Sequence, residues 1–362
     1  MHQKLIDKLL QRQRVGTYRE LSTYQTFKDF YSNDYLGFAR NNTIQLKLKG
    51  ATGSRLISGN SMEAIECENF LASHFHAESS LVFNSGYSAN VGLLSTVPQR
   101  GDVILYDERI HASAKDGMRL SFADSYSFKH HDYEELKRLL SKFKDKVTYV
   151  VVEALYSMDG TMAHFRKLTQ ICNDFSAYLI VDEAHSAGIF GDKGRGVVSA
   201  LGLEDAVFAR IVTFGKSYGI VGAAVLGSEN LKNFLVNFAR PFIYTTALPD
   251  AIYQQIKENV SEEQLPSLQQ ALQKNIAFFR ANFKHSGCVS EVNSPIQIIQ
   301  IGNVERTKRL ALILQKNQFA VKPILAPTVP EGQECLRICL HSFDEQDDIA
   351  KLISILTNEL DK

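Results

Sequence analysis

The chain has 362 residues, of which 44% are apolar and 22% charged, and its 40 basic residues balance 40 acidic ones. This length suits two domains with a large core better than one small module. The balance excludes a global field that would attract nucleic acid or an anionic membrane, so an anionic ligand needs a local site. No apolar run reaches the ~20 residues of a membrane span. The N-terminal stretch MHQKLIDKLLQRQRVGTYRE lacks the apolar core of a signal peptide.

Strands and helices alternate along the middle of the chain, after a basic, helix-like N-terminus. A helix is predicted over about 87–96, and a second one over 165–175 has four apolar residues on one face. Continuously apolar strands that alternate with amphipathic helices predict a mostly parallel sheet covered on both faces. The strands of this sheet are predicted at SLVFNSG (80–86), DVILYD (102–107), VTYVVVEALYS (147–157), AYLIVDEAH (177–185), ARIVTFGK (209–216) and GAAVLGS (222–228).

The pattern changes after about residue 250. A long helical stretch over roughly 250–284 precedes two short strands, IQIIQIG (296–302) and CLRICLH (335–341), and a final helix with one apolar stripe. We therefore expect three segments: an N-terminal helix and a segment bordering the active site in 1–45, a large α/β domain in 46–250, and a small α+β domain in 251–362.

Cysteine and histidine usage gives no sign of a disulfide framework or a metal site. The five cysteines, at positions 67, 172, 288, 335 and 339, are odd in number and lack CxxC spacing. They predict reduced core thiols in a cytoplasmic protein. The histidines of HFH (74–76) and HH (130–131) have no matching Cys or His cluster, so we expect surface histidines and no metal.

One lysine lies within the apolar, glycine-rich stretch IVTFGKSYGIVGAAVLG (211–227). Both flanks of Lys216 are predicted to be short buried strands. A buried ammonium is costly unless it is paired or neutralised, and burial lowers its pKa. A neutral amine in a pocket is a nucleophile that can form an imine with a carbonyl. The alternative is a lysine on a solvent-facing loop, and this stretch alone leaves both interpretations open.

Polar residues stand at the ends of four other predicted strands. Asp182 ends one strand with His185 three residues beyond it, His111 follows a second, and Ser157 follows a third. A Ser-Gly pair ends the fourth and begins a helix, where main-chain N–H groups and the helix dipole can hold a phosphate. Each feature alone also fits a turn, a helix cap or an exposed loop residue.

Together these residues fit the needs of one cofactor. A carbonyl cofactor with a phosphate and an aromatic nitrogen requires an imine-forming amine, an anion site, a carboxylate and a stacking group. Lys216, Gly86 with Tyr87, Asp182 and His111 match these needs in kind. The chemistry is that of pyridoxal phosphate, whose protonated ring accepts electrons from the substrate Cα, and Asp182 would keep the ring nitrogen protonated. A dinucleotide is excluded, because no glycine cluster of the chain fits GxGxxG.

The sequence resembles the α-oxoamine synthases, which are pyridoxal-phosphate enzymes that join an amino acid to an acyl thioester. The resemblance implies the aspartate-aminotransferase fold (pyridoxal-phosphate fold type I), in which a large α/β domain with a mostly parallel, seven-stranded sheet is followed by a smaller C-terminal α+β domain. It runs from about residue 20 to the end, through YSNDYLGF (31–38), FNSGYSAN (83–90), DERIHAS (107–113), EALYSMDG (153–160), VDEAHSAGIFGDKGRG (181–196), VTFGKSYGIVGAAVLGS (212–228), YTTALP (244–249) and PTVPEGQECLRICL (327–340).

The resemblance implies roles for the strand-end residues. Lys216 would form the imine with the cofactor, and Asp182 would pair with the pyridine nitrogen. His111 would stack on the ring, and His185 and Ser157 would lie near its phenolic oxygen. The catalytic residues would be Lys216, Asp182 and His111.

The resemblance also implies how phosphate and substrate are held. Gly86 and Tyr87 would cradle the phosphate with main-chain groups, and Thr213 would assist them. Thr246 would reach the phosphate of a neighbouring subunit, so the active sites would lie at a homodimer interface. The substrate residues would be Arg337, which grips the amino-acid carboxylate, Asn33, and Arg19 near the far end of the acyl chain.

Within the family, the segments around Lys216 and PTVPEG are most similar to the members that condense L-alanine with a pimeloyl thioester in biotin biosynthesis. The thioester would be pimeloyl-CoA or a pimeloyl carrier protein. Arg55 stands near the acyl-substrate region, where such members often have histidine. Three alternatives stay open: another α-oxoamine synthase that uses glycine or serine, a pyridoxal-phosphate aminotransferase, and a catalytically inactive partner subunit. The presence of Lys216 counts against the inactive subunit.

Overall fold

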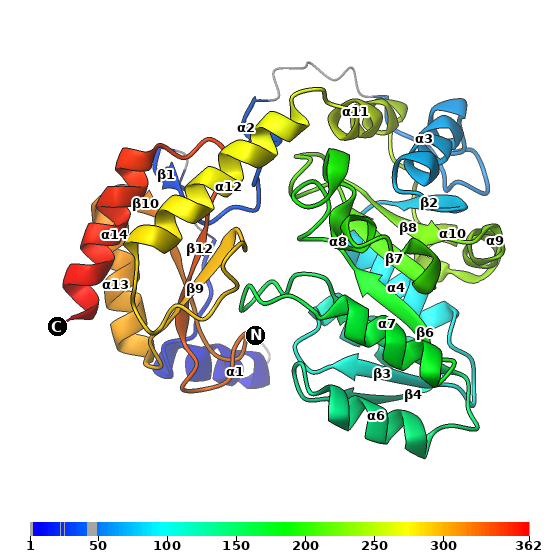
Figure 1. Ribbon diagram of the computed structural model, residues 1–362, viewed down its shortest axis with the longest axis horizontal. Coiled ribbons are helices and arrows are strands. Elements are labelled where there is room, and N and C mark those ends of the chain that lie inside the picture. Colours follow the sequence, from blue (N-terminus) through cyan, green and yellow to red (C-terminus); the bar gives the residue numbers. More distant parts are fainter. Residues whose placement is uncertain (1–2, 22, 25, 42–48, 362) are drawn as a thin grey trace. The chain divides into compact units, whose positions relative to one another are not determined.

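The computed structural model describes residues 3–21, 23–24, 26–41 and 49–361 (Figure 1). The chain divides into two compact units. The large unit comprises residues 34–157 and 162–270, and the small unit comprises 1–33, 158–161 and 271–362. The N-terminal residues thus group with the C-terminal part of the chain. The segments expected from the sequence, 1–45, 46–250 and 251–362, stay a prediction.

A seven-stranded sheet forms the centre of the large unit (Figure 1). All pairs are parallel except those made by β8, which is antiparallel to both of its neighbours. Six strands therefore run in one direction, and their carboxyl ends meet at one edge. The mostly parallel seven-stranded sheet is confirmed. Its order is β2 (Ser79–Phe83), β8 (Ala223–Gly227), β7 (Ala209–Thr213), β6 (Tyr178–Asp182), β5 (Thr148–Glu153), β3 (Val103–Asp107) and β4 (Asp124–Phe128).

Apolar residues alternate between two cores on the two faces of this sheet. Val151 of β5 and Ile180 of β6 belong to one core, and their strand neighbours Val150 and Val181 belong to the other. Because side chains alternate along a strand, each central strand is buried on both faces and is continuously apolar. The first core, which we call the α4-side core, includes residues of α4 (Gly86–Thr96) and α5 (Ala112–Leu120).

The helices of the large unit connect these strands. Residues of α6 and α7 contribute to the second core, opposite the α4-side core. The helix α12 begins in the large unit and ends in the small one. Besides α4 and α5, the helices are α2 (Phe38–Asn41), α3 (Met62–His74), α6 (Tyr133–Lys142), α7 (Phe165–Asp174), α8 (Gly196–Ala200), α9 (Glu229–Phe238), α10 (Arg240–Ile243), α11 (Asp250–Val260) and α12 (Leu265–Asn282).

The small unit is an α+β structure. The strands β11 (Lys322–Ile324), β12 (Cys335–Cys339) and β9 (Ile296–Gln300) form an antiparallel sheet with β12 in the middle. A second, two-stranded sheet pairs β1 (Lys28–Asp29) with β10 (Phe319–Ala320) in parallel. The helices here are α1 (Gln3–Arg14), α13 (Val304–Lys316) and α14 (Gln346–Leu360).

Two elements differ from the sequence-based expectation. The helical stretch expected over 250–284 is two helices, because α11 ends at Val260 and α12 begins at Leu265. Pro266 lacks an N–H donor and fits only the first turn of a helix, which accounts for the new start. The strand β4 was not expected. Only Phe128 of its five residues is buried, so this edge strand has no apolar run. No helix of the described residues is long and apolar enough to cross a bilayer.

Candidate active site

The strand ends at the carboxyl edge of the large sheet bring the predicted polar residues together. Counting along the strands from the alternating apolar residues, Glu153 of β5, Asp182 of β6 and Thr213 of β7 all lie on the side of the α4-side core. Glu153 and Asp182 are direct partners in the register of the two strands. This edge is where ligands bind in open parallel sheets.

Lys216 follows β7, in the connection to β8. Its Nζ lies 2.7 Å from His185 Nε2, and His185 Nδ1 lies 2.8 Å from the hydroxyl oxygen of Tyr35. His185 and Tyr35 are buried, whereas Lys216 itself is half-buried rather than fully buried. These contacts fit a neutral imidazole that accepts a hydrogen bond from Lys216 and donates one to Tyr35. His185 therefore fixes the direction of the lysine amine.

Asp182 is held by two donors of its own unit. The side-chain amide of Asn90, on α4, donates to Oδ2 at 2.8 Å, and the main-chain N–H of Ala184 donates to Oδ1 at 2.9 Å. Asp182 is 5% exposed. A carboxylate fixed in this way can present negative charge to a cationic ring nitrogen.

His111 caps the N-terminus of α5. Its Nδ1 accepts a hydrogen bond from the main-chain N–H of Ser113 at 3.2 Å, and the Ser113 hydroxyl lies 2.7 Å from the same atom. Burial lowers the pKa of His111, although the charge of Asp182 acts in the opposite direction. With Nδ1 as the acceptor, a neutral imidazole carries its proton on Nε2, which can donate to a substrate oxygen.

The first turn of α4 meets the end of β7. The side chain of Ser85 caps the helix by accepting from the N–H of Ser88. A Cβ atom on Gly86 would lie 2.5 Å from the Thr213 methyl carbon, which is below any real contact. Only glycine therefore lets this helix start approach β7. The exposed Tyr87 turns its hydroxyl to Asp116 of α5, at 2.7 Å.

Glu153 and Ser157 lie between these groups. Ser157 is 7% exposed, and its main-chain N–H donates to Glu153 Oε2 at 3.3 Å. Burial and the charge of Asp182 raise the pKa of Glu153 to about 8, against the influence of Lys216. A carboxyl with this pKa is mostly protonated at neutral pH.

Thr246 lies on the surface of the large unit, next to exposed apolar side chains. It forms an isolated antiparallel bridge with Ser54, and its carbonyl accepts from Asn84 at 3.0 Å. Ile57 is 84% exposed and Tyr244 72% exposed. Exposed apolar side chains mark a protein contact where they form one contiguous patch.

The expected substrate residues belong to the small unit. Arg337, on β12, is 9% exposed, and its guanidinium donates to Asn33 Oδ1 and to Cys339 Sγ, both at 2.9 Å. Asn33 thus fixes the direction of Arg337. Arg19 donates to the Thr328 hydroxyl at 3.0 Å. A cavity of about 580 Å³ lies beside this pair, with Lys8, Gln11, Arg12, Val15, Thr17, Val304, Ala326, Pro327, Glu331 and Glu334 in its lining.

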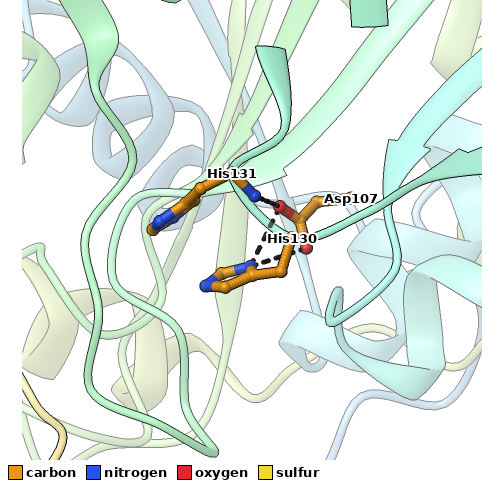
Figure 2. A group of neighbouring side chains, drawn as sticks. All are labelled: Asp107, His130 and His131. Carbon is orange, nitrogen blue, oxygen red and sulfur yellow. Dashed lines mark hydrogen bonds and ion pairs between the residues drawn. The ribbon is translucent and has the colours of Figure 1, made fainter. Parts of the chain in front are cut away.

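A second polar cluster, Asp107 with His130 and His131, lies at the end of β3, four residues before His111 in the sequence (Figure 2). Here the expectation of surface histidines at 130–131 is wrong. The His130 side chain is 10% exposed, and its Nδ1 lies 2.9 Å from Asp107 Oδ1. The His131 main-chain N–H donates to Asp107 Oδ2 at 3.2 Å, and Arg109 N–H donates to Oδ1 at 2.9 Å. Of the other histidines expected on the surface, His76 is exposed and His74 half-buried.

One ligand atom from each of Asp107, His130 and His131 lies within 4.8 Å of the others, a spacing that could hold a metal ion, and the expectation of no metal stays a prediction. The His130 hydrogen bonds keep the pKa of Asp107 below its ordinary value, although burial would raise it. The rings of His130 and His131 stack with their centroids 3.7 Å apart (Figure 2). Asp107 and His130 also fix the start of the loop that carries His111.

Arg55 has internal partners. Its guanidinium donates to both carboxylate oxygens of Glu68, at 2.8 and 3.3 Å, and to Asn60 at 2.8 Å. The side chains of Arg55 and Glu68 are 9% and 2% exposed. The ring of Tyr253 lies 5.7 Å from the guanidinium carbon. Arg55 therefore holds the segment before α3, and its charge is already compensated.

Sequence reasoning missed four residues of this arrangement: Tyr35, Asn90, Glu153 and Thr328. Each lies in a segment that was singled out, at a position given no role. Asn90 could have been found, because it follows Gly86 by four residues and so lies on the same face of α4. Nothing in the sequence indicated that Tyr35 would meet His185, 150 positions away.

Comparisons with known proteins concern the family of the whole chain. The aminotransferase class I and II family matches residues 27–354. An 8-amino-7-oxononanoate synthase of Emericella nidulans is 38% identical, with 92% of this chain and 89% of that protein covered. One of Lysinibacillus sphaericus is 33% identical, with 91% and 89% covered.

Solved structures also resemble this chain. The crystal structure of an 8-amino-7-oxononanoate synthase from Francisella tularensis is 30% identical and has a TM-score of 0.78, with 93% of this chain and 98% of that one covered. A serine palmitoyltransferase of Sphingomonas wittichii has a TM-score of 0.90 at 24% identity, with 98% and 96% covered, and this likeness concerns the fold.

Proposed function

The chain belongs to the aminotransferase class I and II family and, within it, to the pyridoxal-phosphate enzymes called α-oxoamine synthases, and we propose that it joins L-alanine to a pimeloyl thioester. The products are 8-amino-7-oxononanoate, CO₂ and the free thiol, as biotin biosynthesis requires. A bond forms between the alanine Cα and the thioester carbonyl carbon. The C–S bond and the bond to the alanine carboxyl group break.

One observation carries this proposal: the amine of Lys216 lies 2.7 Å from His185 at the same sheet edge where Asp182 is held by Asn90. An amine, a fixed carboxylate and a helix start that excludes a Cβ are the donor set that the cofactor needs. Lys216 Nζ would bind the cofactor carbonyl covalently, and Asp182 would pair with the ring nitrogen. The names of the relatives support the choice of substrates.

The remaining cofactor residues follow from the same edge. The first-turn N–H groups of Gly86 and Tyr87 would bind the phosphate, because helix N-termini attract anions. Thr213, which meets Gly86, would add its hydroxyl. His111 would cover the ring, and His185 and Ser157 would lie at its phenolic oxygen.

When bound, pyridoxal phosphate supplies a ring that withdraws electrons from the substrate Cα. Lys216 Nζ accepts the Cα proton of alanine and later returns a proton to the product. His185 orients Nζ for both transfers. The His111 Nε2–H donates to the thioester carbonyl oxygen, where negative charge develops.

The substrate ends are assigned to the small unit. Arg337 binds the alanine carboxylate through its guanidinium, which Asn33 holds in place. Arg19, whose partner is Thr328, binds the far carboxylate of the pimeloyl chain. The identity of the thiol, CoA or a carrier protein, follows from neither residue.

We further propose a homodimer, in which Thr246 reaches the phosphate bound by the other subunit. The exposed apolar side chains beside Thr246, such as Ile57 and Tyr244, support this interface. A cytoplasmic location is part of the same proposal.

The test is visible absorbance of the purified protein with pyridoxal phosphate, after addition of L-alanine, glycine or L-serine. Each amino acid is added with and without pimeloyl-CoA, and the products are identified by mass spectrometry. We expect a spectral response to alanine, and 8-amino-7-oxononanoate only when pimeloyl-CoA is present. A response to glycine or serine alone would overturn the substrate. Conversion of the amino acid to a keto acid without a thioester would indicate an aminotransferase.

A further inference from the structure

Glu153 is a buried carboxyl at the centre of the cofactor edge, and the proposed mechanism gives it no role. It ends β5 and is 3% exposed. Its Oε2 accepts the main-chain N–H of Ser157, at 3.3 Å. No group of the described residues lies in hydrogen-bonding geometry to its buried Oε1. An ionised carboxylate with one buried, unsatisfied oxygen is costly, whereas the neutral acid is much less so.

The neighbours of Glu153 make ionisation harder. Asp182 is its direct partner in the strand register, and both side chains lie on the same face of the sheet. Two carboxylates in such adjacent positions repel each other, so one of them keeps a proton. Both oxygens of Asp182 accept a hydrogen bond, from the amide of Asn90 and the N–H of Ala184, whereas Oε1 of Glu153 has no donor among the described residues.

The other groups around Glu153 do not change the conclusion that Glu153, rather than Asp182, keeps the proton. Lys216 acts in favour of ionisation, and so do the main-chain N–H groups of Ser157 and His111, but burial and Asp182 outweigh them and raise the pKa of Glu153 to about 8. The phenol of Tyr156 is also buried beside it, and its pKa is raised well above the ordinary value by burial.

Glu183, one residue beyond Asp182, shows the opposite arrangement. Its Oε2 accepts two bonds from the Arg210 guanidinium, and its Oε1 accepts from Ser186 and from the N–H of Val198. Glu183 therefore has a guanidinium partner and donors on both oxygens. Of the two oxygens of Glu153, only Oε2 has a donor among the described residues.

We propose that Glu153 holds a proton at neutral pH, and that as a positioning residue it limits the Glu153–Asp182 pair to one negative charge, which stays on Asp182. A full charge on Asp182 is what a cationic ring nitrogen requires. Loss of the Glu153 proton would place a second negative charge beside Asp182 and alter the field at Lys216. The protonation itself is a property of the chain, and its role at the ring rests on the proposed function.

The proton can be observed directly by infrared spectroscopy. The carbonyl band of a protonated carboxyl is recorded in ²H₂O for the full-length protein, with and without pyridoxal phosphate, between pH 6 and 10. The isosteric variant Glu153→Gln identifies the band that belongs to Glu153. We expect a band at pH 6 that fades through about pH 8 and is missing in Glu153→Gln. If wild type and Glu153→Gln give identical carbonyl bands at pH 6, the proposal is overturned.

Asp182→Asn tests the coupling. This variant removes the repelling charge and keeps the shape of the side chain, so the Glu153 band of the protein without cofactor should fade at a lower pH than in wild type. An unchanged midpoint pH would show that Asp182 does not hold the proton on Glu153, and would overturn the proposed pair. Should Glu153→Gln not fold, ¹³Cδ-glutamate labelling of wild type reports the same titration. A Glu153 band in a protein that binds no pyridoxal phosphate would leave the protonation standing and overturn only the proposed function.

Discussion

Lys216 and His185 form a hydrogen-bonded pair, with Nζ and Nε2 2.7 Å apart, and Tyr35 holds the far side of the imidazole. The three side chains come from distant parts of the sequence, and all of them belong to the large unit. The pair directs an otherwise flexible lysine side chain to one point at the carboxyl edge of the sheet. A side chain with four rotatable bonds that is held in this way loses little additional entropy when it reacts.

Replacing Lys216 with alanine should reduce turnover by ~10³-fold or more, because the same amine serves as nucleophile and base. The measurement is product formation from alanine and pimeloyl-CoA, together with visible absorbance after addition of pyridoxal phosphate. The exposed Lys351, on α14, gives a matched control, and Lys351→Ala should behave as wild type. Turnover close to wild type in Lys216→Ala would remove the lysine from the mechanism.

Replacing Gly86 with alanine should weaken cofactor binding, because the new Cβ would lie 2.5 Å from the Thr213 methyl carbon. The added volume displaces the helix start that would hold the phosphate. The dissociation constant for pyridoxal phosphate is measured by titration. Gly50→Ala is the control, since nothing lies within 4 Å of a Cβ there.

The double variant Gly86→Ala with Thr213→Ser makes the cause of this loss testable. Serine keeps the hydroxyl of Thr213 and removes the methyl group that clashes. Binding should therefore recover in the double variant relative to Gly86→Ala alone. No recovery would mean that the steric contact is not what Gly86 avoids.

Arg337 should control the affinity for alanine. Replacing it with alanine removes a charged, two-pronged donor and should raise KM for alanine by roughly 10- to 100-fold, the range expected for hydrogen bonds between charged groups. Asn33→Ala leaves the charge and removes only the 2.9 Å contact that orients it, so its effect on KM should be smaller. An equal KM for the amino acid in all three proteins would contradict this assignment.

His341 should make stability depend on pH. It is buried at the start of the segment before α14, where burial would lower its pKa, but the bond and charge of Asp344 and the charge of Asp29 raise it above the ordinary value. Its Nδ1 lies 3.2 Å from Asp344 and its Nε2 3.2 Å from the Ser32 carbonyl oxygen. The folded state thus binds a proton more tightly than the unfolded state.

The sign follows from linkage. This contribution to stability is complete below the unfolded pKa of about 6.5 and is lost as the pH rises through the higher folded value. The free energy of unfolding of wild type should exceed that of His341→Gln most at pH 6, and the difference should shrink towards pH 9. His76→Gln gives the same substitution at an exposed site, where the side chain pairs with Glu204 at 3.3 Å, for comparison. A difference that is constant over this range would contradict the assignment of the proton to His341.

Arg55 should matter for stability and not for the choice of acyl group. Arg55→Ala leaves Glu68, which is 2% exposed, with the Lys232 amine at 3.4 Å as its one charged partner among the residues that the structure describes. Breaking a buried pair in this way costs ~3–5 kcal/mol of unfolding free energy. Denaturant unfolding measures the loss, and KM for pimeloyl-CoA should stay within about twofold of wild type at a temperature where the variant is folded. A selective change in that KM would give Arg55 a role in substrate binding instead.

Much of this site was predictable from the sequence, because apolar strands that end in polar residues indicate both the sheet and its functional edge. Lys216, Asp182 and His111 were predicted in that way, and they lie at or just after the ends of β7, β6 and β3. Pro266 was a local signal of the break between α11 and α12, but the helical pattern over 250–284 was interpreted as one continuous stretch. The edge strand β4 could not be found, since four of its five residues are exposed and give no apolar run.

Contacts between residues far apart in the chain could not be predicted from the sequence, for a different reason. Tyr35 and His185 meet because the fold closes a loop of 150 residues, and no local pattern encodes that contact. The state of Glu153 is likewise set by its neighbour on another strand. The histidines at 130–131 were wrongly expected at the surface, because Asp107, the partner that buries His130, is 23 positions away.

The reversed strand β8 has a consequence for the order in which the site forms. Because β8 returns alongside β7, the connection that carries Lys216 spans only residues 214–222, and hydrogen bonds from Phe214 to Gly222 and from Ile220 to Phe214 close it. Short loops lose little entropy on closure and close quickly. A hairpin of this kind can assemble before the distant strands are in place. Lys216 would then already be in position when the remaining strands join the sheet and the cofactor later binds.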